Sequence, residues 1–301
     1  MAAASPRFYH RYRQQTETEA IYGESALRWA YETAAGRGTL WALLRRPAFS
    51  RYYGWRMNRP ASRRRIAPFI AEFELDPEEF AQPVESYATF NEFFYRELRP
   101  EARPLRGDEH DAVFPADGRH RGVPDLAATG FLYAKGQQLS VVELLGDRDL
   151  GARFAGGSAI ISRLCPTDYH RFHAPVAGDL TRQVRLPGPL YSVNPIALAR
   201  RITYLWQNAR VVSLIEGSPF GAVAFVAIGA TCVGTIAMTK TPGQTVARGD
   251  ELGYFAFGGS CVITVFEPGA AQLAEDLLRA GDDEMELYAQ VRDLAARATS
   301  A

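Results

Sequence analysis

The sequence has only three cysteines in 301 residues, Cys165, Cys232 and Cys261. One stays unpaired in any pairing scheme, and three are too few for a disulfide scaffold, so we expect reduced thiols. No run of 18 or more apolar residues occurs, so the sequence predicts no membrane-spanning helix. The first residues, MAAASPRFYHRYRQQTETE, lack the apolar core of a secretory signal, and we expect the chain to stay in the cytosol.

Internal repeats and low-complexity linkers are also lacking, as are helix-turn-helix, zinc-finger and RNA-recognition signatures. We therefore expect no nucleic-acid partner. What is present suits a packed globular protein, because 47% of the residues are hydrophobic and 12% are aromatic. The length allows one large domain or two small ones.

Charge is unevenly spread, although its sum is zero. Residues 1–70 hold thirteen arginines and four glutamates, a net charge of +9, so the remainder carries −9. Aromatic side chains accompany the arginines, as in LWALLRRPAFSRYY and YGWRMNRPASRRR, a mixture that favours an anionic membrane surface. The alternative is a solvated arginine face at residues 63–65 with Trp29, Trp41 and Trp55 in the core.

Hydrophobic spacing divides the chain into three parts. From about Glu17 to Phe80 it is helical, and YATFNEFFYREL predicts another amphipathic helix with Phe90, Phe93 and Phe94 on one face. From Val113 onward, short segments rich in Val, Ile and Phe alternate with Gly and Pro, which predicts a mainly antiparallel β body. The acidic last thirty or so residues return to a helical pattern.

The segment CPTDYHRFHAP concentrates two of the five histidines, His170 and His173, close to Cys165 and Asp168. A zinc site is one interpretation, but C-x4-H-x2-H supplies at most three ligands at an unfamiliar spacing. Core histidines held by hydrogen bonds are a second. Acid/base catalysis or anion binding is favoured for the pair, because imidazole titrates near neutral pH and arginine binds carboxylate or phosphate.

Two further motifs contain candidate functional residues, an aspartate in the first and a serine in the second. FPADGRH predicts a turn, and its Asp117 is either a turn former or the residue that orients a histidine. In FGGSCVITVFE, Ser260 follows two glycines, and its hydroxyl is able to attack the unscreened Gly259 carbonyl. A serine hydrolase is the competing catalytic interpretation, but Val262 breaks the pattern G-x-S-x-G. The structural interpretation of the two glycines is a bulge at the start of a strand.

These motifs, in this order, resemble phosphatidylserine decarboxylase. The resemblance extends over seven blocks between Phe90 and Glu267, namely FNEFFYRELRPEARP, FPADG, LCPTDYHRFHAP, YSVNPIAL, GAT followed by VGTIAM, RGDELGYFAFGGS and VITVFE. Two positions depart from the family pattern. Cys261 stands where Thr or Ser is usual, and Ala209 where Glu is frequent.

The resemblance implies a proenzyme that cuts itself between Gly259 and Ser260 into a large chain, 1–259, and a small chain, 260–301. Ser260 would become a pyruvoyl group, with no external cofactor and no metal. His173 would be the cleavage base, oriented by Asp117. Substrate binding would involve His170, Tyr169 and Arg171.

The implied function is decarboxylation of phosphatidylserine to phosphatidylethanolamine and CO2 by a homo-oligomer docked on the cytoplasmic side of the cell membrane. The alternatives are a decarboxylase of a free aromatic amino acid and an uncleaved lipid-binding homologue. The implied fold is α+β, with a helical membrane-docking segment over residues 1–85 and a catalytic domain over residues 86–301. That domain would be a β-rich duplicated barrel-sandwich hybrid with a short helical tail.

Overall fold

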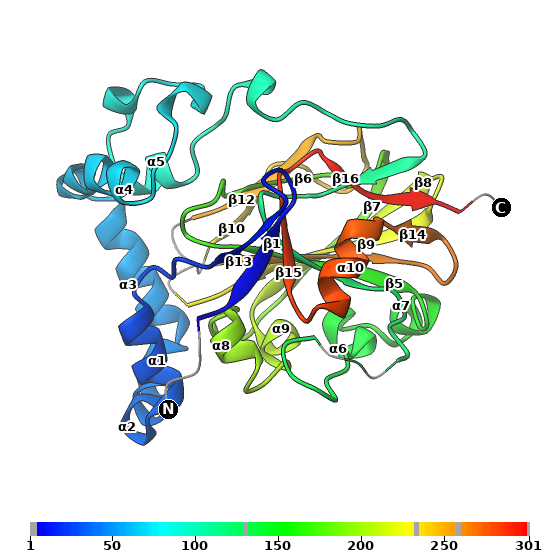
Figure 1. The fold of residues 1–301 in the computed structure, drawn as a ribbon, viewed down its shortest axis with the longest axis horizontal. Coiled ribbons are helices and arrows are strands. Elements are labelled where there is room, and N and C mark those ends of the chain that lie inside the picture. Colours follow the sequence, from blue (N-terminus) through cyan, green and yellow to red (C-terminus); the bar gives the residue numbers. More distant parts are fainter. Residues whose placement is uncertain (1–4, 129, 131, 232–234, 257–259, 300–301) are drawn as a thin grey trace.

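The computed structural model describes residues 5–128, 130, 132–231, 235–256 and 260–299. Its N-terminal helices gather at one side, its strands lie mainly in the middle, and the later helices pack around the strands (Figure 1). Within the described ranges, no helix has both the length and the apolar character needed to cross a bilayer. The fold is a mixed α+β arrangement, in agreement with the coarse expectation.

The N-terminal helices begin where the sequence supplies helix-start signals. Thr33 accepts a hydrogen bond from Gly36 N at the start of α2, Pro47 opens α3, and Thr89 accepts one from Glu92 N at the start of α5. The elements of this region are α1 (Glu24–Glu32), α2 (Ala34–Thr39), the π-helix η1 (Leu40–Leu44), α3 (Pro47–Met57), α4 (Ile66–Glu72), α5 (Phe90–Phe94) and the 3-10 helices η2 (Pro60–Arg65), η3 (Pro77–Glu79), η4 (Val84–Ser86) and η5 (Pro100–Ala102).

A ten-stranded sheet forms the body, in the order β11-β7-β8-β9-β13-β5-β4-β15-β1-β2. Its described strand pairs are antiparallel except for β1 with β15. The strands are β1 (Arg7–His10), β2 (Gln15–Thr18), β4 (Gly118–Val123), β5 (Ser158–Leu164), β7 (Gly178–Leu186), β8 (Arg210–Ser218), β9 (Gly221–Gly229), β11 (Gln244–Val246), β13 (Ser260–Phe266) and β15 (Glu286–Ala289).

Two three-stranded sheets accompany the large one. The first has the order β10-β12-β6, and the second β14-β16-β3. Their strands are β10 (Ile236–Met238), β12 (Glu251–Phe255), β6 (Arg171–His173), β14 (Ala271–Leu273), β16 (Leu294–Ala298) and β3 (Asp111–Val113). The remaining helices are α6 (Val141–Leu145), α7 (Arg148–Arg153), α8 (Pro195–Leu198), α9 (Tyr204–Gln207) and α10 (Glu275–Asp282).

The centre of the large sheet is covered on both faces, which explains its nearly continuous apolar runs. Along β13, Ile263 and Val265 pack into a core shared with α6, α8 and α9. Val262 and Phe266 alternate onto the other face and pack with α10 and the small sheets. A third, mainly aromatic cluster joins α3, α4 and α5, and it buries Phe90, Phe93 and Phe94 as the spacing predicts.

Three expectations about elements need correction. The first 18 residues include β1 and β2, which extend the large sheet, so the N-terminal segment is not wholly helical. The predicted helical tail contains one helix, α10, flanked by the strands β14, β15 and β16, because pairing with β4 and β3 outweighs local helix propensity. Trp29, Trp41 and Trp55 are 43%, 62% and 54% exposed, so the interpretation that places them in the core is wrong.

Candidate active site

Ser260 is the first residue of β13, a central strand of the large sheet. It lies opposite Leu164 of β5 on one side and Gly229 of β9 on the other. Its side chain is fully buried, and its Oγ has no hydrogen-bond partner among the described residues. An unpaired buried hydroxyl is costly, and it leaves the Ser260 Oγ available to react. The other half of the predicted cleavage site, Gly259, lies outside the described residues.

The histidine motif runs beside Ser260. The backbone N–H of Phe255, at the end of β12, donates to the His170 carbonyl at 2.9 Å. The end of β12 therefore lies beside His170, and β13 begins at Ser260, opposite Leu164. The predicted cleavage site therefore lies between two residues, Phe255 and Ser260, that both contact the histidine segment, here residues 164–173. Ser260 therefore lies next to Leu164, the residue before Cys165 of the histidine motif.

His173 is a buried histidine with both ring nitrogens in contact. Its Nδ1 lies 2.9 Å from the Gly249 carbonyl, and its Nε2 lies 3.3 Å from the Tyr169 hydroxyl. Because a carbonyl only accepts, Nδ1 carries the hydrogen and Nε2 is the basic nitrogen. Burial lowers the pKa of His173 to about 4, so the ring is neutral at physiological pH and able to act as a base.

Gly249 owes its place to the turn between β11 and β12. Its φ of +82° is in the left-handed region, and its N–H donates to the Ala174 carbonyl at 2.8 Å. The Arg292 Nε donates to the same Gly249 carbonyl at 3.0 Å. The sequence analysis identified neither residue. The motif RGDELG, which contains Gly249, indicates only a turn, and Arg292 lies outside the motifs.

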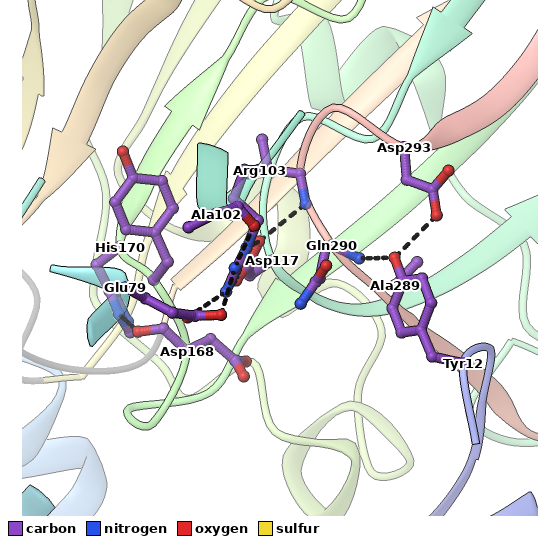
Figure 2. A network of polar contacts seen from close by, with 12 residues as sticks. Tyr12, Glu79, Ala102, Arg103, Asp117, Asp168, His170, Ala289, Gln290 and Asp293 are labelled. Atoms are coloured by element: carbon purple, nitrogen blue, oxygen red, sulfur yellow. Dashed lines mark hydrogen bonds and ion pairs between the residues drawn. The ribbon is translucent and has the colours of Figure 1, made fainter. Parts of the chain in front are cut away.

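The Asp117 carboxylate is held by Arg103 rather than by a histidine (Figure 2). The Arg103 Nε and Nη2 donate to it at 2.7–3.0 Å, and the backbone N–H of Val291 donates at 2.8 Å. Arg103 also contacts the Glu79 carboxylate at 2.9 and 3.0 Å. Asp117 acts on His173 through its charge, which favours the protonated ring. Its predicted role as the residue that orients His173 stays a prediction.

His170 is fully buried, with its ring 3.9 Å from that of Phe94, centroid to centroid. Its Nδ1 lies 2.9 Å from the Asp168 carbonyl. The guanidinium of Arg171 contacts the carboxylates of Glu251 and Glu97 at 2.7 and 3.1 Å. The substrate-binding roles of His170, Tyr169 and Arg171 stay predictions.

A mainly apolar cavity of about 300 Å³ lies between the N-terminal helices and the end of β5. Its walls include Leu27, Leu40 and Tyr53 from the helices, and Leu164, the strand neighbour of Ser260. Its polar lining includes Glu19, Arg163, Ser192, Asn194 and Thr231. The sequence gives no signal for this cavity, because its walls come from segments far apart in the chain.

The Cys165 thiol lies in a polar network. It donates to Glu19 at 2.9 Å, and burial raises the pKa of the thiol. Among the residues that the structure describes, no group of three or more His, Cys, Asp and Glu side chains is placed to hold a metal ion. Cys165 and Cys261 are both buried free thiols, and Cys232 lies outside the described residues.

The helices around the cavity also carry a surface of exposed aromatic and basic side chains. Arg45 lies over the ring of Trp41 at 5.0 Å, and Arg59 over that of Trp55 at 4.8 Å. We call this the aromatic–arginine surface, and it comprises Trp29, Trp41, Leu43, Arg45, Arg46, Tyr52, Trp55 and Arg59.

Comparison with known proteins supports the resemblance stated above. The family model for phosphatidylserine decarboxylase matches residues 90–291. Proteins named phosphatidylserine decarboxylase proenzyme are similar over nearly the whole chain. That of Desulfitobacterium hafniense strain Y51 is 36% identical over 272 residues, covering 90% of this chain and 91% of its own. That of Chlamydia trachomatis serovar L2 is 38% identical over 278 residues, covering 92% of each chain. This chain therefore belongs to the phosphatidylserine decarboxylase family and is a decarboxylase.

Proposed function

We propose that the chain is a self-processing proenzyme that cuts itself between Gly259 and Ser260 and then converts phosphatidylserine to phosphatidylethanolamine and CO2. Its membership of the family and the printed names of its relatives support this proposal. The observation that carries it is the Ser260 hydroxyl, which is buried and has no partner in the described part of the chain. That hydroxyl lies where the histidine motif meets a central strand.

Cleavage requires a nucleophile and a base, and the site offers both. The Ser260 Oγ attacks the Gly259 carbonyl, the C–N bond breaks, and an ester replaces the amide. Loss of the Ser260 Cα proton then breaks the Cβ–O bond, which leaves Gly259 as a carboxylate and residue 260 as dehydroalanine. Dehydroalanine, an enamine, tautomerises to an imine, and water hydrolyses the imine with release of ammonia, so a pyruvoyl group begins the small chain. In this scheme His173 takes the protons, because burial keeps its Nε2 unprotonated and able to accept one.

Ser260 fits a residue destined for this group, since its hydroxyl is not committed to another contact within the described residues. Bound in place, the pyruvoyl group supplies the electron sink for loss of CO2, a task that other enzymes give to an external cofactor. The chain's own residues then manage protons and geometry. His170 is held next to the predicted cleavage segment and gives a proton to the carbon that CO2 leaves.

A lipid substrate is favoured over a free amino acid by the apolar cavity and the surface above it. The cavity of about 300 Å³ adjoins Leu164, the strand neighbour of Ser260, and suits part of an acyl chain. The aromatic–arginine surface, on the same helices, suits the headgroup layer of an anionic bilayer. We propose that the enzyme is a peripheral protein on the cytoplasmic side of the cell membrane.

The test is release of CO2 from phosphatidylserine in vesicles, compared with release from free serine and free tyrosine. We expect turnover of the lipid alone, and loss of that turnover in Ser260→Ala, which should remain a single chain. Turnover of a free amino acid with no turnover of the lipid would overturn the substrate proposal. Normal turnover by Ser260→Ala would overturn the role of Ser260.

A further inference from the structure

Arg119 of β4 is a buried arginine that the proposed mechanism leaves without a role. Its guanidinium lies between two aromatic rings, 4.9 Å from the centroid of Phe8 and 5.2 Å from that of Tyr288. Its Nη1 lies 2.6 Å from each carboxylate oxygen of Asp168. Both side chains are nearly excluded from solvent, at 10% and 5% exposure. Because water does not solvate either charge, each depends on the other for compensation, and this holds the pair in position.

Asp168 connects Arg119 to the backbone turn that precedes His170. Its Oδ2 accepts from the N–H of Cys165 at 2.7 Å, and its own N–H donates to the Cys165 carbonyl at 2.9 Å. These two bonds close the turn Cys165-Pro166-Thr167-Asp168. The carbonyl at the end of this turn is the one that contacts His170 Nδ1 (Figure 2).

This contact decides which ring nitrogen of His170 exchanges a proton. Because a carbonyl only accepts, Nδ1 keeps its hydrogen, and Nε2 is the nitrogen that gives or takes the proton. The Phe94 ring packs against the imidazole without fixing which nitrogen is protonated. The Asp168 carbonyl is thus a contact that orients the ring through Nδ1.

Burial raises the pKa of the Asp168 carboxyl, and the Arg119 charge opposes that rise. Without Arg119, the carboxylate would be buried and unpaired. It would then take up a proton or move toward solvent, and either change would disturb the turn that it closes.

We propose that Arg119 is a positioning residue for His170. By holding the Asp168 carboxylate, it fixes the carbonyl that orients the His170 ring, and through that ring it sets the rate of decarboxylation. This inference rests on the proposed function, in which His170 supplies a proton after cleavage. His173 is held by different contacts, the Gly249 carbonyl and the Tyr169 hydroxyl, so self-cleavage depends less on Arg119.

The kinetic test compares Arg119→Gln, Arg119→Lys and Asp168→Asn. Arg119→Gln and Asp168→Asn should still cleave into two chains, while kcat falls roughly ten- to a hundredfold and KM changes less than about threefold. Arg119→Lys keeps a charge opposite Asp168 and should recover most of kcat. The matched control is Arg11→Gln, which removes the ion pairs of Arg11 with Asp276 and Asp293 elsewhere in the fold. It should lose stability but keep kcat.

A second readout does not depend on turnover. In the uncleaved Ser260→Ala protein labelled with ¹⁵N-histidine, the Nδ1–H signal of His170, assigned with His170→Asn, should be present and protected from exchange. It should be lost or strongly shifted when Arg119→Gln or Asp168→Asn is added, and it should persist with Arg11→Gln. Asp168→Asn, nearly equal in shape, decides the matter if Arg119→Gln fails to fold.

The two proposals fail in different ways. A wild-type protein that does not decarboxylate phosphatidylserine contradicts the proposed function, whereas the Nδ1–H signal still tests the positioning of His170. A wild type that turns over, together with variants whose kcat and His170 signal match it, overturns the role of Arg119. An equal loss of kcat in Arg11→Gln overturns it as well, because the effect would then be one of general stability.

Discussion

At the scale of single residues, two histidines three positions apart have different surroundings. The His173 Nδ1 contacts a carbonyl 76 residues away in the chain, that of Gly249. The His170 Nδ1 contacts a carbonyl two residues away, that of Asp168. Separate acceptors allow the two rings to be oriented independently. The resemblance implies different roles for the two rings, cleavage for His173 and decarboxylation for His170, and these roles stay predictions.

The first prediction separates these roles. His173→Ala should block or greatly slow self-cleavage, because no neutral imidazole would remain to take protons from Ser260. His170→Ala should cleave normally and then decarboxylate about a hundredfold more slowly or worse, the usual cost of losing an acid/base group. Gel analysis of the two chains and CO2 release measure the two steps. His110→Ala, an exposed histidine, is the control and should behave as wild type. Normal cleavage and turnover in both variants would show that the roles are misassigned.

The second prediction concerns the pH dependence of stability. Burial lowers the pKa of His173 to about 4 and that of His120 to about 3, below the value near 6.5 in the unfolded chain. As pH falls below 6.5, the unfolded chain therefore binds protons first, and stability is lost progressively toward pH 4. Over the full window, the loss is about 3 kcal/mol for His173 and about 5 kcal/mol for His120.

The uncleaved Ser260→Ala protein is suited to this measurement, because it unfolds as one chain. Its free energy of unfolding, measured by urea at pH 7, 6, 5 and 4.5, should fall at each step. His173→Gln in the same background should show a smaller fall. A free energy that stays constant across this range would contradict the protonation states assigned to the buried rings.

The sequence predicts the reactive residues better than their partners. Ser260, His170 and His173 carry recognisable chemistry in short motifs, and the structure brings their segments together. Arg103 and Gly249 escaped prediction because their contacts depend on how distant segments meet. Every residue also has a backbone carbonyl, so the sequence does not indicate that the carbonyl of Gly249 is the one that accepts from His173.

At the scale of elements, Arg103 joins the N-terminal helical region to the catalytic sheet. It follows η5, and it binds Asp117 just before β4 and Glu79 at the end of η3. Asp117 is in turn fixed by the Val291 N–H, which follows β15. One guanidinium thus connects three segments that meet at the predicted active site.

The third prediction tests this connection. Arg103→Met leaves Asp117 buried without its cation, so it should lower the free energy of unfolding by about 3 kcal/mol and slow self-cleavage. Glu79→Gln removes only the more exposed carboxylate and should cost about 1 kcal/mol or less. Glu78→Gln, at the highly exposed neighbouring position, is the control and should change stability by less than about 0.5 kcal/mol. Equal effects of Arg103→Met and Glu78→Gln would contradict the connection.

Element type could be predicted where periodicity and burial agree. The runs in β5, β8, β9 and β13 are apolar because both faces of the sheet are covered, and they form strands as predicted. The segment ending in β15 and β16 reads as an acidic helix by its spacing. It forms strands because vacant edges of β4 and β3 accept it, and such long-range pairing leaves no mark in a local window.

At the scale of the whole molecule, the basic part of the sequence lies mainly in one region of the fold. Most of the region with a net charge of +9, residues 1–70, forms the N-terminal helices at one side of the fold (Figure 1). Among their large aromatic side chains, Trp29, Trp41, Tyr52 and Trp55 are exposed. Those helices also form one wall of the apolar cavity. In the proposed function, a lipid drawn from a bilayer at this side would enter the cavity whose lining includes Leu164, the strand neighbour of Ser260.

The fourth prediction follows from this placement. Trp41→Ala combined with Trp55→Ala should weaken binding to phosphatidylglycerol vesicles at least about tenfold, because both rings and their stacked arginines leave the headgroup layer. Phosphatidylglycerol separates surface binding from substrate binding. Leu105→Ala, an exposed apolar residue outside the helices, is the control. Unchanged vesicle sedimentation of the double variant would contradict the docking surface.

The most direct test of the central claim is the intact mass of the purified wild-type protein. The account predicts two chains, and the smaller comprises residues 260–301, which are 42 residues, at a mass below that of the unmodified peptide by one ammonia. That difference is the conversion of an N-terminal serine to a pyruvoyl group. A single unmodified chain of 301 residues, or a small chain that retains its serine mass, would contradict the account.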